Sequence, residues 1–164
     1  MEYLAYFQPN IELSDLILEQ KGIVLPSSGL HSTLCFFYMN PENEKDLISE
    51  LSKIKFNSFE IRTLGFDDFD NSSLVLKLSR PEELLGLHKD IAGVVEEYAS
   101  LGFNEISEKY YGENYAPHLT IADSSSDFDK DCDVLSSQIG FISQYFLSKK
   151  IKNDWRKIET FCSS

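Results

Sequence analysis

The sequence GLHSTL at residues 29–34 and the sequence YAPHLTIA at residues 115–122 share one pattern. Each contains a histidine and a threonine two positions apart, His31 with Thr33 and His118 with Thr120. The chain has only three histidines. Two such pairs would therefore arise by chance with a probability of roughly a few in a thousand. The repetition indicates that the two pairs work together.

Both motifs lie among strand-forming residues. Side chains alternate between the two faces of a β-strand, so a residue and its second neighbour point the same way. Each motif is therefore expected to present an imidazole and a hydroxyl side by side. Apolar or aromatic residues continue the motifs over 34–38 and 119–122, and we expect both motifs to lie on inner strands.

Two imidazoles are suited to acid-base chemistry, because their unperturbed pKa of about 6.5 lies near neutrality. A neutral one can activate water or a hydroxyl while a protonated one donates to the leaving oxygen on the far side of a phosphorus atom. Threonine hydroxyls can donate to phosphoryl oxygens, and no metal is required. A single histidine is more often a core or boundary residue. We apply this interpretation to His88, which lacks a partnering threonine.

At these motifs the chain resembles the 2H phosphoesterase superfamily, which includes the LigT-type RNA 2′,3′-cyclic phosphodiesterases, also called 2′-5′ RNA ligases. The resemblance covers most of the chain in the order of its expected elements, and the second motif is the more specific one. It implies a LigT-like α+β fold with two lobes, pseudo-symmetric antiparallel sheets, flanking helices and a central cleft.

The resemblance also implies an activity and its residues. His31 and His118 would be the catalytic acid and base, in an order that the sequence leaves open, and Thr33 and Thr120 would bind the phosphoryl group. The implied reaction is metal-independent hydrolysis of a 2′,3′-cyclic phosphate or a 2′-5′ phosphodiester in RNA or a small nucleotide. Whether hydrolysis or 2′-5′ RNA ligation matters in the cell stays open.

Two tyrosines are candidates for substrate binding. Tyr6 lies in the strand expected at residues 2–8 and Tyr115 opens the second motif, and an aromatic ring can stack on any base or contact a ribose. A role in the hydrophobic core is an equal alternative for both.

Composition limits the class of protein. The 164 residues are 42% hydrophobic, enough for the core of a single domain over residues 1–164. The N-terminus lacks the pattern of a secretory signal, and no apolar run is long enough for a membrane span. We therefore expect a cytoplasmic monomer without a membrane partner, and no cofactor, since no glycine-rich phosphate-binding loop is present.

The net charge, the basic residues and the cysteines limit the kinds of binding partner to expect. A net charge of −12 disfavours a broad nucleic-acid surface and favours a small nucleotide or an RNA end as substrate. A basic cluster at residues 149–157 is either a solvated strand edge or a secondary phosphate contact. Lys77 and Arg62 could reach a cleft, but alternation does not decide their faces. Cys35, within an apolar run, is expected to be buried.

The remaining patterns predict the following elements: a strand at 2–8, a helix at 11–20, a helix from Pro41, strands at 57–66 and 73–79 with a turn at 67–71, a long helix from Pro81, and two strands around 149–154.

Two other functions stay open. A module that binds nucleotides or RNA ends could have this fold with little turnover. A metal site could combine the histidines with Asp123 or Asp127, although the sequence has no close ligand pair such as His-x-x-x-His.

Overall fold

The computed structural model describes residues 1–26, 29–69, 72–99, 111–123, 128 and 133–164. Within these ranges the elements are, in chain order, β1 (Glu2–Phe7), α1 (Ile11–Leu18), β2 (Ser32–Tyr38), η1 (Pro41–Asn43), α2 (Glu44–Leu51), β3 (Phe59–Phe69), β4 (Ser73–Leu78), α3 (Glu82–Tyr98), η2 (Gly112–Asn114), β5 (His118–Asp123), η3 (Asp133–Leu135), β6 (Ile139–Ile142), β7 (Gln144–Ile151) and β8 (Asp154–Cys162). The elements labelled η are short 3₁₀ helices.

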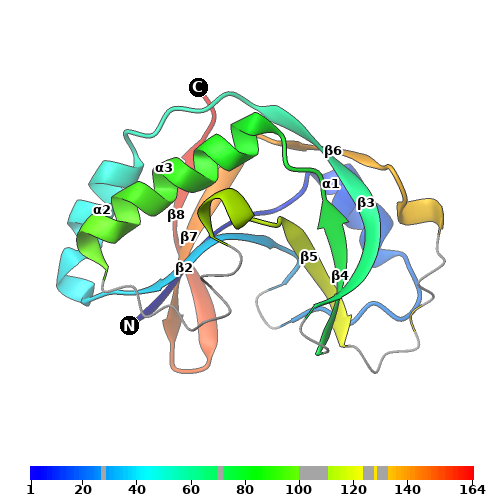
Figure 1. Ribbon diagram of the computed structural model, residues 1–164. Helices are drawn as coiled ribbons and strands as arrows, with labels where there is room; N and C mark the ends of the chain where they lie inside the picture. The colour runs from blue at the N-terminus through cyan, green and yellow to red at the C-terminus, as the bar shows by residue number, and fades with distance from the viewer. Residues whose placement is uncertain (27–28, 70–71, 100–110, 124–127, 129–132) are drawn as a thin grey trace.

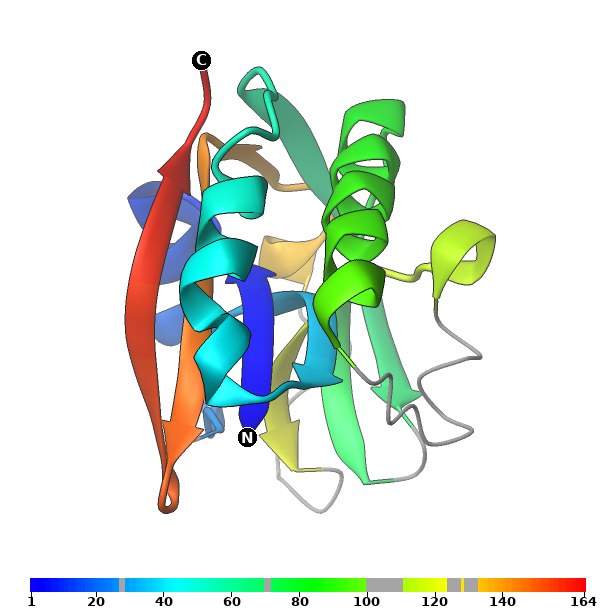
Figure 2. The same ribbon diagram turned by 90° about the vertical axis from the view of Figure 1, so that its left-hand side faces the viewer.

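The strands of the described residues form two antiparallel four-stranded sheets (Figure 1). The first sheet has the order β2-β1-β7-β8 and combines the two ends of the chain, whereas the second has the order β5-β4-β3-β6 and uses its middle. In Figure 2, α2 lies in front of the first sheet, and α3 lies beside α2 at the β2 edge of that sheet. The structure thus confirms the α+β fold with two antiparallel sheets that the family resemblance implied.

The helices connect the two sheets. α1 follows a strand of the first sheet but packs against β6 of the second, where Asn10 at its N-terminus accepts a hydrogen bond from the Phe141 N–H at 2.9 Å. α3 follows a strand of the second sheet but packs against β2 of the first. Each sheet therefore packs against a helix that follows a strand of the other sheet. These two helices connect the lobes.

Buried aromatic residues attach α2 to the first sheet. The rings of Tyr3 and Phe37, on neighbouring strands, stack with centroids 5.5 Å apart. The Tyr3 hydroxyl donates to Glu44 at the start of α2 (3.0 Å), and the Tyr145 hydroxyl donates to the Leu51 carbonyl at its end (3.1 Å). Both ends of the helix are thus tied to the sheet through tyrosines that are otherwise packed in the core.

The expected turn at residues 67–71 is wrong in its first part. β3 continues to Phe69, because Asp67 pairs with Val75 and Phe69 pairs with Ser73 in the ladder with β4. Aspartate is disfavoured in strands, but here it is exposed and forms an ion pair with Lys77 at 3.4 Å. The rest of the expected turn, residues 70–71, lies outside the described residues.

Of the helices that the structure describes, none has the length and apolar character needed to cross a membrane.

The contact between α1 and β6 yields a test of packing. A methyl group at Gly140 would lie 2.7 Å from Leu13 Cδ2 and 3.0 Å from Asn10 Oδ1. We expect Gly140→Ala to lower the free energy of unfolding by about 1–3 kcal/mol through overpacking, measured by urea denaturation. Gly93→Ala is the matched control, because this exposed position in α3 has open space around it and alanine should stabilise a helix there by up to about 1 kcal/mol. Equal losses in both variants would contradict the packing argument.

Candidate active site

The two His-x-Thr motifs lie on the strands at which the two sheets meet. β2 is an edge strand of the first sheet and β5 is an edge strand of the second, and these edges approach each other without pairing. The expectation of inner strands is therefore wrong. Their apolar composition reflects burial by segments other than strands, such as residues 23–25, where the Val24 N–H donates to the Ile121 carbonyl at 2.9 Å.

Each motif is followed by a β-bulge. In the pairing of β1 with β2, Tyr6 faces Thr33 and Ala5 faces Cys35, so Leu34 is the extra residue. In the pairing of β4 with β5, Ile121 is the extra residue, because the register passes from Thr120 directly to Ala122. A bulge bends its strand and re-aims the neighbouring side chains. Both bulge residues are buried while the two threonines stay half-buried.

His31 lies immediately before β2 and is half-buried. Its Nδ1 lies 2.9 Å from the carbonyl of Gly29, two residues earlier, and the Tyr6 ring meets the imidazole edge-on at 5.4 Å. Burial lowers the pKa of His31 below its usual 6.5; the Gly29 carbonyl opposes this shift, and the charge of His118 adds to it. The charge of His118 thus acts on the same imidazole that Tyr6 contacts.

His118 is the first residue of β5 and has a parallel environment. Its Nδ1 lies 2.9 Å from the carbonyl of Ala116, again two residues earlier. Phe69 packs against the imidazole with ring centroids 4.5 Å apart. Lys77 of β4 is its partner in the strand register. Each histidine of the predicted pair is thus held by a carbonyl on one side and an aromatic ring on the other.

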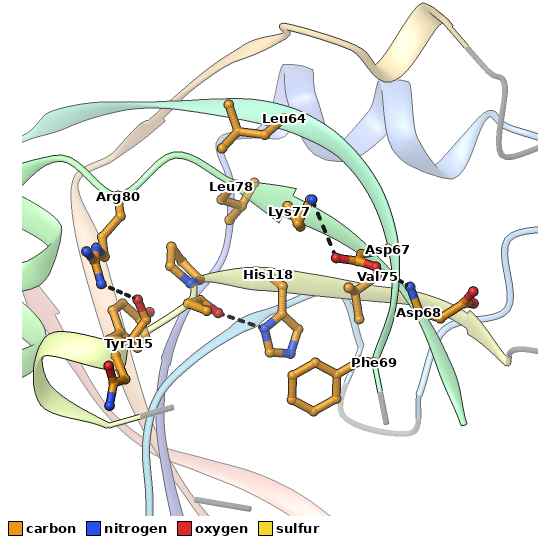
Figure 3. A pocket seen from close by; sticks show the side chains of 13 residues that line it. Leu64, Asp67, Asp68, Phe69, Val75, Lys77, Leu78, Arg80, Tyr115 and His118 are labelled. Carbon is orange, nitrogen blue, oxygen red and sulfur yellow. Dashed lines mark hydrogen bonds and ion pairs between the residues drawn. The ribbon is translucent and has the colours of Figure 1, made fainter. Parts of the chain in front are cut away.

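His118 lines a cavity of about 450 Å³ on the second sheet (Figure 3). Leu64, Val75 and Leu78 form apolar walls, and Asp67 and Lys77 add charged groups. Arg80 lines the cavity and donates from Nη1 to the carbonyls of Glu113 at 2.6 Å and Tyr115 at 2.9 Å. A pocket with apolar walls and a few polar groups suits a small organic ligand.

Sequence reasoning missed three of the residues in this cavity, Asp67, Phe69 and Arg80. The first two were assigned to a turn, although Asp67 and Phe69 have the period-two spacing that continues a strand. Of the two basic residues that alternation left undecided, Lys77 lines the cavity, whereas Arg62 pairs with Glu60 at 2.7 Å and lines a different depression.

The structure places the two predicted substrate-binding tyrosines differently. Tyr6 is half-buried beside His31, and its hydroxyl accepts a hydrogen bond from Ser148 at 3.3 Å. Tyr115 is 5% exposed, stacks on His88, and donates its hydroxyl to the Thr33 carbonyl at 3.0 Å. Tyr115 lies in the core and also lines the cavity beside His118, whereas Tyr6 lies beside the first motif.

The basic cluster at residues 149–157 is divided between two strands: Lys149 and Lys150 lie on the inner strand β7, and only the part on β8 lies at a sheet edge. Lys149 bonds to Glu44 at 2.8 Å, and Lys150 bonds to Glu2 at 2.9 Å. Lys157, on the edge strand β8, lies over the Phe146 ring at 4.5 Å. Phe146 packs against Tyr6, and Tyr6 contacts His31. Two aromatic rings therefore connect the Lys157 ammonium to His31.

Two further expectations concern a metal site and the burial of Cys35. Among the residues that the structure describes, no group of three or more His, Cys, Asp or Glu side chains is arranged to hold a metal ion. Asp127 lies outside the described residues. Cys35 is buried, as predicted, and burial raises the pKa of its thiol to about 12.

Solved structures share this fold over nearly the full chain. E. coli LigT complexed with 3′-AMP is 15% identical, with a TM-score of 0.68 and coverage of 99% of this chain and 98% of that chain. TT0787 of Thermus thermophilus is 21% identical, with a TM-score of 0.70 and coverage of 99% and 97%. A structure described as a phosphoesterase is 15% identical, with a TM-score of 0.72 and coverage of 99% and 98%.

No curated protein matches the sequence. Residues 23–136 match the 2′-5′ RNA ligase superfamily, a span that includes both His-x-Thr motifs. The match covers more than half of the chain, and the shared fold agrees with it. The chain therefore belongs to the 2′-5′ RNA ligase superfamily.

Proposed function

We propose that this protein is a metal-independent phosphoesterase that hydrolyses a 2′,3′-cyclic phosphate or a 2′-5′ phosphodiester in RNA or a small nucleotide. The observation that carries this proposal is the paired geometry of the motifs. Each histidine bonds through Nδ1 to the carbonyl two residues earlier, and each is followed by a threonine and a bulge on one of two facing sheet edges.

The carbonyl bonds support a role for Nε2 of each ring in the proposed chemistry. A carbonyl only accepts hydrogen bonds, so Nδ1 of each imidazole must carry a hydrogen. In the neutral ring Nε2 is then the basic nitrogen, and in the charged ring it is the nitrogen that gives up a proton. Both histidines are thus prepared for proton exchange through Nε2.

The lowered pKa of His31 supports one assignment of the two roles. Burial disfavours the charged form of a histidine, and His31 has a lowered pKa for this reason. We assign His31 as the base and His118 as the acid. Nε2 of His31 takes a proton from water as the water oxygen bonds to phosphorus, and His118 gives its Nε2 proton to the ribose oxygen as the old P–O bond breaks. The product is a phosphomonoester.

Two threonines and one lysine support this chemistry. Thr33 and Thr120 are assigned to donate hydrogen bonds to the non-bridging phosphoryl oxygens, where negative charge accumulates in the transition state. Lys77, the register partner of His118, adds positive charge on the same sheet face. The cavity beside His118 offers space for part of a nucleotide, and E. coli LigT, which has this fold, was crystallised with 3′-AMP.

Removal of either imidazole should abolish turnover. We expect His31→Ala and His118→Ala each to lower kcat at least about 100-fold, measured on nucleoside 2′,3′-cyclic phosphates and 2′-5′-linked dinucleotides in excess EDTA. Circular dichroism checks that both variants fold. Unchanged turnover in either variant would overturn the mechanism. Nucleotide binding without product from the wild type would favour a binding module, and activity abolished by EDTA would favour a metal site.

The threonine hydroxyls allow an isosteric test. Thr33→Val and Thr120→Val keep the shape of the side chain and remove the donor, so we expect kcat/KM to fall by about 100-fold. Thr160→Val is the matched control, because Thr160 is exposed on β8, and it should keep wild-type kinetics. Equal effects at all three positions would argue against phosphoryl binding by Thr33 and Thr120.

The lowered pKa of His31 predicts the acidic side of the pH profile. A general base works when it is unprotonated, so a pKa below 6.5 keeps His31 competent at lower pH than an unperturbed histidine. The acid limb of kcat/KM against pH should therefore have its midpoint below 6.5. A midpoint above that value, in a protein that stays folded over the range, would contradict the assignment of His31 as the base.

A further inference from the structure

His88 of α3 is 2% exposed and uses both ring nitrogens. Its Nδ1 lies 2.7 Å from the Leu34 carbonyl, which accepts a hydrogen bond, and its Nε2 accepts the Gly112 N–H at 3.0 Å. An imidazole that donates at one nitrogen and accepts at the other is neutral, with its hydrogen on Nδ1. Burial lowers the pKa of His88 and maintains this form.

The two bonds reach both halves of the candidate active site. Leu34 is the bulge residue that follows the first His-x-Thr motif. Gly112 begins the 3₁₀ helix η2, which leads into the second motif. His88 thus joins the edge of one sheet to the segment that precedes the edge strand of the other.

Tyr115 forms a second connection of the same kind. Its ring stacks on the His88 imidazole with centroids 4.1 Å apart and an interplanar angle of 5°. Its hydroxyl donates to the Thr33 carbonyl at 3.0 Å. Tyr115 lies three residues before His118, so the stacked pair spans from the backbone of the first motif to the approach of the second.

The hydrogen bonds of His88 and Tyr115 take the place of a neighbouring strand at the outer edge of β2. β2 pairs only with β1 among the described strands, so its outer edge presents backbone groups that need partners where they are buried. At the bulge the carbonyls of Thr33 and Leu34 find their partners in two side chains, not in β5. The distance between the two edges therefore depends on the dimensions of the His88–Tyr115 stack.

We propose that His88, stacked on Tyr115, is a positioning residue that sets the separation of the two His-x-Thr motifs. His88 itself touches neither reacting atom. Its catalytic consequence rests on the function proposed above, because transfer of two protons across one phosphorus requires a defined spacing of the two imidazoles. The structural part of the proposal, the spacing itself, holds for any activity of the site.

The variants separate the hydrogen bonds from the ring. His88→Phe keeps a ring for stacking and removes both bonds. His88→Gln can restore one donor and one acceptor. Lys89→Ala is the matched control, because Lys89 also ties α3 to η2, through an exposed ion pair with Glu113, but contributes little and has no bond to β2 among those that the structure gives.

The first measurement reads the spacing without any enzyme activity. Imidazole NMR titrations give the pKa of His31 in proteins with and without His118→Gln, and the difference measures the electrostatic coupling between the two histidines. We expect His88→Phe to reduce this coupling at least twofold and Lys89→Ala to leave it unchanged. Unchanged coupling in a folded His88→Phe protein would overturn the proposal.

The second measurement is kinetic. A displacement of catalytic groups by about 1 Å can cost up to about 100-fold in rate, so we expect His88→Phe to lower kcat at least tenfold with little change in KM. His88→Gln should recover part of this loss. An equal loss in His88→Phe and Lys89→Ala would indicate general destabilisation and overturn the positioning role. If the wild type has no phosphoesterase activity, the proposed function fails and the coupling measurement alone decides the positioning role.

If His88→Phe does not fold, Tyr115→Phe takes its place. This variant keeps the stack and removes only the hydroxyl that bonds to the Thr33 carbonyl. A reduced coupling supports the proposal, and wild-type coupling overturns it.

Discussion

The outer edge of β2 is the constraint on which the site depends. A strand edge carries backbone carbonyls and N–H groups, and when they are buried they must be paired. In this protein the edge meets the edge of a second sheet, yet no ladder forms between them. Side chains from α3 and from the approach to β5 bond to its carbonyls instead. The two sheets therefore stay separate although their edges approach each other.

The path of the chain supports this arrangement. The first sheet needs strands from both ends of the chain, and each sheet is covered by a helix that follows a strand of the other. The segment that forms the second sheet therefore lies between the two segments that form the first, and the two lobes are interleaved along the chain. The two β-bulges orient the side chains of the motifs. Each bulge turns the residue after the threonine into the core and leaves the histidine and the threonine partly exposed.

Much of the framework could be predicted from residue patterns. The strand near Tyr3, the long helix after Pro81 and the burial of Cys35 follow from periodicity and composition, which act over a few neighbouring residues. His88 was interpreted as a structural residue at a boundary, and the structure instead buries it. Turn propensity misled at Asp67, where pairing with β4 outweighed the weak preference of aspartate against strands. Residue patterns could not predict on which face of the sheet Lys77 and Arg62 lie, because β-bulges change the face to which side chains point.

The sequence by itself determined which residues form the motifs, the family to which they point and the elements that hold them, since spacing along a chain decides local structure. Only the tertiary structure decided that both motifs lie on edge strands, that Phe69 and Tyr6 flank the two imidazoles, and that Tyr115 lies in the core. These facts depend on contacts between segments far apart in the chain. Leu34 and His88, for example, are 54 positions apart, and no local pattern encodes the meeting of a carbonyl and an imidazole at that separation.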